Sequence, residues 1–98
     1  MLYMVQAQID PVTGTEVEGD PERMESVLGS WQALNPIGMY ASMTRRELTV
    51  IVEAPNEDSL FEALHATWTA AKTYPTVTPV VTMDEFPGMM QRAGLGPQ

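Results

Sequence analysis

A strand followed at once by an amphipathic helix is the most constraining feature of this sequence, and it occupies residues 47–65, ELTVIVEAPNEDSLFEALH. Leu48, Val50 and Val52 alternate with a mostly polar set that includes one isoleucine, and β-branched residues dominate, which predicts a strand with one face in a core. Pro55 ends this strand, and Asn56 is suited to the N-cap of a helix that continues to about Lys72. A strand that turns directly into a helix predicts a sheet covered by helices on one face.

Three further segments show the period of two that is typical of strands, namely residues 2–9, 37–43 and 76–83. In 37–43 we expect the methionine-rich side to face the core, and that side is Ile37, Met39, Ala41 and Met43. Residues 44–46 are so few that the second and third strands must be antiparallel. Pro79 lacks a backbone N–H, so the last strand is expected at a sheet edge or at a bulge.

The first two strands are separated by a predicted loop and a predicted helix. Residues 10–19, DPVTGTEVEG, hold a proline, two glycines and only two apolar side chains, which favours a long acidic loop. Asp20 and Pro21 are typical of the first positions of a helix. Apolar residues then recur at helical spacing over 21–34, and they are Met24, Val27, Leu28, Trp31 and Leu34.

The C-terminal segment is rich in glycine and proline, and it is expected to hold at most one turn of helix at residues 89–92. The sequence therefore predicts a single domain over residues 1–85. Residues 86–98 are predicted to form a tail that is flexible or packed on a partner subunit.

The order of elements, βαββαβ, predicts an α+β protein of the ferredoxin-like type. Its antiparallel sheet has strand order 4-1-3-2, with two helices on one face. The opposite face mixes apolar side chains with polar ones. A face of this kind on a small protein is typical of an interface, and symmetric dimers are the commonest assemblies. We therefore expect two copies to pair sheet to sheet.

Composition excludes several classes of partner and site. The net charge is −8, from five basic and thirteen acidic residues, which excludes nucleic acid and anionic membrane surfaces as partners. The chain has no cysteine and one histidine, so neither thiolate nor histidine clusters can hold a metal, and we expect no cofactor. No apolar run approaches about 20 residues, and no basic segment precedes the first apolar stretch, which favours a cytoplasmic protein.

Candidate site residues come from the sheet face without helices and from the helix that follows Asn56. General acid–base chemistry needs titratable groups in a pocket, and the catalytic candidates are Glu53, Tyr40 and His65, with Glu47 as a further carboxylate. The substrate-binding candidates are polar side chains of the first three strands, namely Gln6, Gln8, Ser42 and Thr49. A competing interpretation is structural, because a histidine beside Phe61 and Trp68 is typical of packing and a strand-end glutamate is usually solvated.

Two segments carry a resemblance to a known group. Residues 59–65, SLFEALH, and 74–80, YPTVTPV, resemble muconolactone isomerase-like proteins. They also resemble a family of short bacterial proteins of uncharacterised function with a W…V-T-P-V ending. Both groups belong to the dimeric α/β-barrel superfamily. The resemblance implies two ferredoxin-like subunits packed sheet to sheet, with pockets between sheet and helices.

The superfamily that the resemblance implies contains isomerases, cyclases and monooxygenases, together with proteins without known activity. Around the second strand and residues 10–19 the sequence departs from the isomerases, so none of their catalytic residues is carried over. Two hypotheses remain. The chain binds a small, partly apolar molecule and acts as a cofactor-independent isomerase, cyclase or monooxygenase. Alternatively, it is a non-catalytic homodimeric module that binds a ligand or a protein partner.

Overall fold

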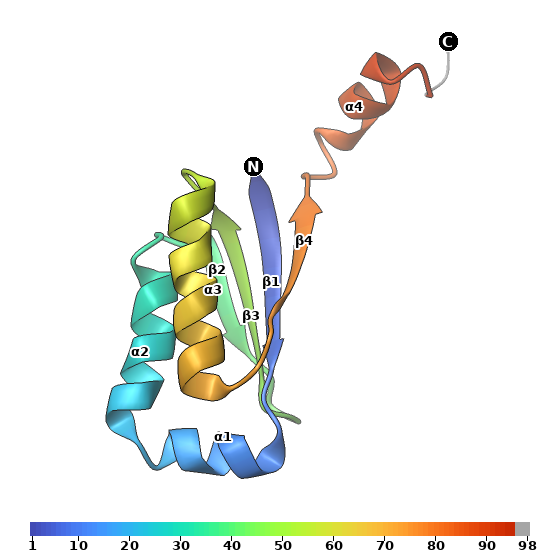
Figure 1. Cartoon of the computed structure of the whole chain (residues 1–98). Helices are drawn as coiled ribbons and strands as arrows, with labels where there is room; N and C mark the ends of the chain where they lie inside the picture. Colours follow the sequence, from blue (N-terminus) through green and yellow to red (C-terminus); the bar gives the residue numbers. More distant parts are fainter. Residues whose placement is uncertain (96–98) are drawn as a thin grey trace.

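The computed structural model describes residues 1–95, and residues 96–98 of the predicted tail lie outside the described part. A four-stranded antiparallel sheet has the order β2-β3-β1-β4. Its strands are β1 (Leu2–Gln8), β2 (Gly38–Ala41), β3 (Glu47–Glu53) and β4 (Thr76–Val80). Helices α2 (Pro21–Gln32) and α3 (Glu57–Ala71) lie side by side on one face (Figure 1). This is the predicted ferredoxin-like fold, with the proline-bearing strand at an edge as expected.

The core lies between the sheet and these two helices, and Trp31 is its largest member. Its side chain is 0 % exposed and packs with Val5, Val50 and Val52 of the sheet. The indole Nε1–H donates to Thr67 Oγ1 at 2.7 Å, and the threonine hydroxyl donates to the carbonyl of Ala63 at 2.9 Å. The buried polar atoms of this layer are therefore satisfied, and the prediction of a structural Trp31 is confirmed.

The prediction of a loop at residues 10–19 is wrong, because this segment contains helix α1 (Pro11–Glu18). Asp10 is its N-cap and accepts a hydrogen bond from the backbone N–H of Thr13 at 2.9 Å. This bond lowers the pKa of the Asp10 carboxyl. Pro11 takes the first helical position, where no backbone donor is needed. Helix α1 runs across the lower end of α2 and α3 (Figure 1).

Both outer strands are shorter than predicted. Strand β2 keeps only four residues, and Met39 alone of the predicted methionine-rich side packs against the core. Ile37 is 70 % exposed and Met43 is fully exposed, so the expectation that they face the core is wrong. Strand β4 ends at Val80, three residues before Met83. The backbone N–H of Ile37 still donates to the carbonyl of Ile51 at 2.8 Å, but Ile37, Met43 and Met83 all lie outside the paired residues of the sheet, so their side chains are not held in the sheet's alternation.

The remaining boundaries differ less. Strand β1 ends one residue early, and α2 ends at Gln32, before Leu34. Arg23 joins the two large helices, because its Nε–H and Nη2–H donate to the carbonyl of Ala70 at 3.0 and 2.7 Å. Helix α4 (Phe86–Arg92) is longer than the single predicted turn. Within residues 1–95, the structure has no helix long and apolar enough to cross a membrane.

Candidate functional site

A pocket of about 290 Å³ lies between α1, α2 and the β2–β3 hairpin, on the helical side of the sheet. We call it the hairpin pocket. Its apolar lining comes from all three elements, and consists of Ile9, Val17, Met24, Val27, Leu28 and Leu48. Val17 and Val27 are buried, whereas the other four are partly exposed. An apolar floor with an accessible rim is typical of small-molecule sites.

Charged side chains form the rim of the hairpin pocket, and Arg46 makes the most side-chain hydrogen bonds among them. Its Nε–H and Nη2–H donate to the two carboxylate oxygens of Glu18 at 3.0 and 3.2 Å, and Nη2 also contacts Thr15 Oγ1 at 3.3 Å. The hydrogen bonds and charge of Arg46 lower the pKa of the Glu18 carboxyl, and Glu18 raises the pKa of Arg46. Nη1 of Arg46 has no hydrogen-bond partner among residues 1–95 and is free to bind an oxygen of a ligand.

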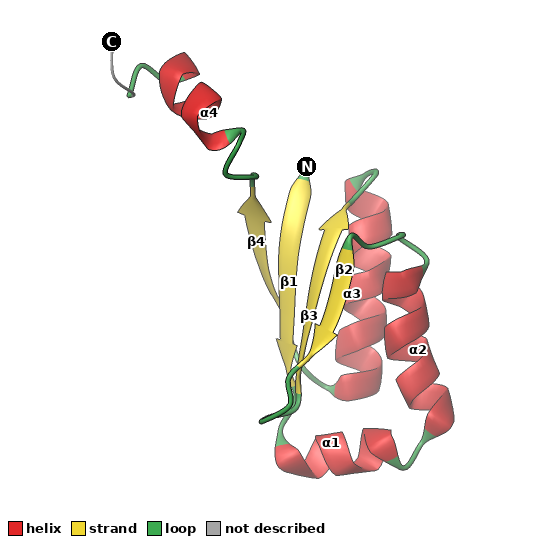
Figure 2. Ribbon diagram, turned by 180° about the vertical axis from the view of Figure 1, so that it is seen from behind, coloured by secondary structure: helices red, strands yellow, loops and turns green. Residues whose placement is uncertain are grey.

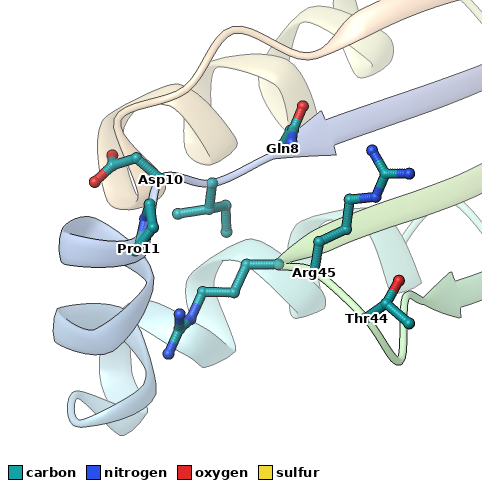
Figure 3. A pocket seen from close by; sticks show the side chains of 7 residues that line it. Gln8, Asp10, Pro11, Thr44 and Arg45 are labelled. Carbon is teal, nitrogen blue, oxygen red and sulfur yellow. The ribbon is translucent and has the colours of Figure 1, made fainter.

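Arg45 and Arg46 both line the hairpin pocket and a second hollow beside it, but their side chains make different contacts. Arg45 pairs loosely with Glu47, with 3.7 Å between Nε and Oε2, and its side chain is 64 % exposed. It borders the second hollow, of about 550 Å³, where Gln8, Asp10 and Thr44 also lie (Figure 3). Arg46 instead reaches α1. The two cations therefore both border the hairpin pocket, and Arg46 is the one that is hydrogen-bonded to α1.

Gly14 explains how Arg46 comes so close to α1. A Cβ atom at position 14 would overlap Cδ and Nε of Arg46, so the arginine side chain crosses the helix where no side chain stands. A substitution at residue 14 can therefore move the side chain of Arg46 without changing the charge of the pocket.

Gly14→Ala is expected to displace Arg46 and to raise the pKa of Glu18 towards its ordinary value of 4.5. In the folded wild type this pKa is lowered, so the ion pair stabilises the fold above that value and the contribution is lost as pH falls. The carboxyl shift of Glu18, followed by NMR through a pH titration, measures the change.

Gly29→Ala on α2 is the matched control, because a Cβ there meets no atom within 4 Å. It should raise stability by up to about 1 kcal/mol through helix propensity and leave the Glu18 titration as it is. If Gly14→Ala also left the titration unchanged, the position of Arg46 would not depend on the glycine.

The structure brings three of the predicted site residues into one row on the sheet face without helices, which we call the open face (Figure 2). Tyr40 is the cross-strand partner of Thr49, and Thr49 is the partner of Gln6. The ring of Tyr40 lies over Gly38, where an added Cβ would overlap it. Gln8 lies one row away, opposite Glu47, and is exposed.

The other predicted residues lie apart from this row. Glu53 is at the far end of β3, 62 % exposed, and accepts a hydrogen bond from the N-terminal amine at 2.8 Å. The hydroxyl of Ser42 accepts from the backbone N–H groups of Thr44 and Arg45 at 3.1 and 3.3 Å, so it shapes the turn. His65 is in the helical layer, with its ring centroid 5.3 Å from that of Trp68. Within residues 1–95, no group of three or more histidine, cysteine, aspartate or glutamate side chains is placed to bind a metal.

Sequence reasoning missed the hairpin pocket except for Ser42 and Glu47 on its rim. The available signal was the Asp10–Pro11 pair, which repeats the Asp20–Pro21 pair that was used to predict α2. Recognising both as helix starts would have placed a short helix beside the β2–β3 turn and its two arginines.

Residues 1–94 match the model of a family described as "Domain of unknown function (DUF3303)". No curated protein matches the chain. Among solved structures, the chain is similar to the 5-chloro-2-hydroxyhydroquinone dehydrochlorinase TftG from Burkholderia phenoliruptrix AC1100, in complex with 2,5-dihydroxybenzoquinone. The two are 14 % identical, the match covers 87 % of this chain and 98 % of that chain, and the TM-score is 0.59. At this identity the likeness shows the shared fold alone.

Proposed function

We propose that this chain, which belongs to the DUF3303 family, binds a small, partly apolar acid in the hairpin pocket. The observation that carries the proposal is an apolar floor beside a guanidinium with a free N–H face. At about 290 Å³ the pocket is at the lower end of the roughly 300–1,000 Å³ that ligand pockets occupy, which suits a molecule with one ring.

Charge supports the acidic nature of this ligand. The chain carries a net charge of −8, yet the rim of the pocket balances two arginines against Glu18 and Glu47. A carboxylate or a phenolate therefore meets less repulsion here than over most of the surface. The quinone complex of the dehydrochlorinase with the same fold, and the resemblance to muconolactone isomerase-like proteins, support a flat molecule with acidic or carbonyl oxygens.

The proposal is one of binding, because Glu47 is the one titratable candidate that lines the hairpin pocket, and it pairs with Arg45. Tyr40 and Glu53 are on the open face, and His65 is on α3. The enzyme hypothesis then keeps the row of Tyr40, Thr49 and Gln6 as a second site on the open face, with Gln8 and Glu53 farther along it. His65 is in the helical layer and Ser42 is in the β2–β3 turn, so neither belongs to that site. That site needs a cover, and we propose that a second copy of the chain supplies it by pairing sheet to sheet.

The open face has the composition that such pairing requires. It carries partly exposed apolar side chains, namely Leu2, Met4, Ile51 and Val80, around the polar row of Tyr40, Thr49 and Gln6. Within residues 1–95 no other element covers it (Figure 2). Pairing removes the apolar groups from water and encloses the polar row.

A ligand screen with two matched variants tests the hairpin pocket. Single-ring carboxylic acids and hydroxyquinones are screened by thermal shift against their neutral amides and methyl ethers, and hits are measured by calorimetry. Arg46→Gln should weaken binding of an acid by about tenfold or more, as expected for loss of a charged hydrogen bond of about 1.5–3 kcal/mol. Arg92→Gln on α4 makes the same change of charge outside the pocket and should leave the affinity unchanged.

A pocket-filling variant provides the second arm of the test. Leu28→Trp places a large ring into the pocket and should abolish binding while the fold, followed by circular dichroism, is kept. Equal effects of Arg92→Gln and Arg46→Gln would overturn the assignment to this pocket. An absence of any hit that separates acids from their neutral analogues would overturn the proposed ligand class.

A further inference from the structure

The C-terminal arm, residues 81–95, leaves the domain at the end of β4 and carries α4 away from the sheet and both large helices (Figures 1 and 2). The molecule is elongated as a result, with principal extents of 56 × 29 × 18 Å. Its radius of gyration is 15.9 Å, whereas a compact chain of this length has about 13 Å. The arm therefore takes no part in the core of its own chain.

The arm has the apolar composition of a packed segment. Four of its large apolar side chains are between 43 and 81 % exposed, and they are Met83, Phe86, Met89 and Leu95. Helix α4 has seven residues and no side-chain hydrogen bond at its N-cap. Isolated helices shorter than about 12–15 residues are marginal in water, so a surface outside this chain is needed to hold α4 as a helix.

A second apolar surface without a cover lies on α3. We call it the aromatic strip, and it consists of Phe61, His65, Trp68 and Tyr74. Successive ring centroids are 6.1, 5.3 and 5.7 Å apart along it. Phe61 is 54 % exposed and Tyr74 is 83 % exposed. Methionine thioethers, of which the arm has three, pack favourably against aromatic rings.

Charges along the arm and the strip are complementary when the two run in opposite directions. The arm begins with Asp84 and Glu85 and ends its helix with Arg92, whereas α3 begins with Glu57 and Asp58 and is followed by Lys72. An antiparallel arrangement sets acidic residues opposite Lys72 at one end and Arg92 opposite the acidic start of α3 at the other. The arm of the same chain points away from its own strip (Figure 1).

We infer that α4 of one copy packs on the aromatic strip of a second copy, antiparallel to its α3. The strip lies in the helical layer, and the open face lies on the other side of the sheet. Arm exchange is thus a separate contact from sheet pairing, and a chain that makes both assembles into more than two copies.

Disulfide trapping tests this contact directly, because the natural chain has no cysteine. Full-length chains carrying His65→Cys are mixed with isotope-labelled chains carrying Met89→Cys, and the disulfide is formed under mild oxidation. A disulfide requires Cα atoms within about 7 Å, so the mixed product should exceed by at least tenfold that from Ser26→Cys on α2 mixed with Met89→Cys. Equal yields from the two mixtures would overturn the inference.

A second measurement uses the mass of the assembly in solution. Phe86→Ser combined with Met89→Ser, and separately Phe61→Ser, should each reduce the assembly to two copies. Val12→Ser removes a side chain that is 71 % exposed on α1, outside both surfaces, and should leave the mass unchanged. A wild-type assembly that never exceeds two copies, or that keeps its mass in the arm variant, contradicts the proposed contact. Ligand binding in the hairpin pocket is measured by separate experiments, so its outcome does not depend on the disulfide trapping or on the mass of the assembly.

Discussion

Trp31→Ala is expected to lower the free energy of unfolding by about 3–5 kcal/mol, the range measured when large aromatic side chains are removed from cores. The indole is fully buried and packs against β1 and β3. Its Nε1–H also joins α2 to α3 through Thr67 at 2.7 Å. The substitution therefore leaves a cavity, and it also removes the N–H that donates a hydrogen bond to the buried hydroxyl of Thr67.

Urea denaturation followed by circular dichroism measures this loss, since the fluorescence of Trp31 disappears with the residue. Small domains are stable by about 5–15 kcal/mol, so Trp31→Phe serves as a milder variant if the alanine form does not fold. Phenylalanine fills most of the space but lacks the N–H, and a loss of about 1–3 kcal/mol is expected. Trp68→Ala, on the partly exposed strip, should cost less than Trp31→Ala. A larger loss of stability for Trp68→Ala than for Trp31→Ala would show that the main core lies at the aromatic strip.

The best-predicted part of the fold is β3 with α3, because two periodicities and a cap point to the same structure. Leu48, Val50 and Val52 alternate towards the core, and Asn56 accepts a hydrogen bond from the N–H of Ser59 at 2.8 Å. Pro79 predicted that β4 lies at an edge or carries a bulge, and the ferredoxin-like strand order placed it at an edge. Such local signals determine the topology because right-handed crossovers leave few ways of joining these elements.

Helix α1 was missed for the opposite reason, since its sequence gives no helical periodicity. Only Val12 and Val17 are apolar in it, and Gly14 and two threonines have low helix propensity. What holds it is tertiary contact: Val17 is 2 % exposed in the core, and Arg46 binds across the helix to Glu18. A contact with a residue 28 positions away in the chain cannot be seen in a local pattern.

The candidate sites also divide into a part that local sequence patterns predict and a part that depends on non-local packing. Alternation along β1 and β3 was enough to place Gln6 and Thr49 side by side on the open face, as their cross-strand pairing confirms. The hairpin pocket depends on α1 and on the direction of Arg46, and both are set by non-local packing. Whether the open face forms an enclosed site depends on a second copy, which no pattern within one chain specifies.

Ile51→Lys is expected to dissociate the sheet-to-sheet pair while the subunit stays folded. Ile51 is at the centre of the open face, between Met4 and Gly38 on the neighbouring strands. In a single subunit its side chain is partly exposed, so a lysine there can extend its ammonium into water. Between two paired sheets the same charge is desolvated without a partner, which costs several kcal/mol. The dissociation constant should rise by about 100-fold or more, because each tenfold step corresponds to about 1.4 kcal/mol.

The measurement is made in the background of Phe86→Ser with Met89→Ser, so that sheet pairing is the only proposed contact that remains. Sedimentation should show two copies without Ile51→Lys and one copy with it. Thr69→Lys introduces the same charge on the exposed side of α3 and should keep the pair. If Ile51→Lys and Thr69→Lys gave the same mass, the open face would not be the pairing surface. The row of Tyr40, Thr49 and Gln6 would then face solvent, and a second site there would lose its enclosure.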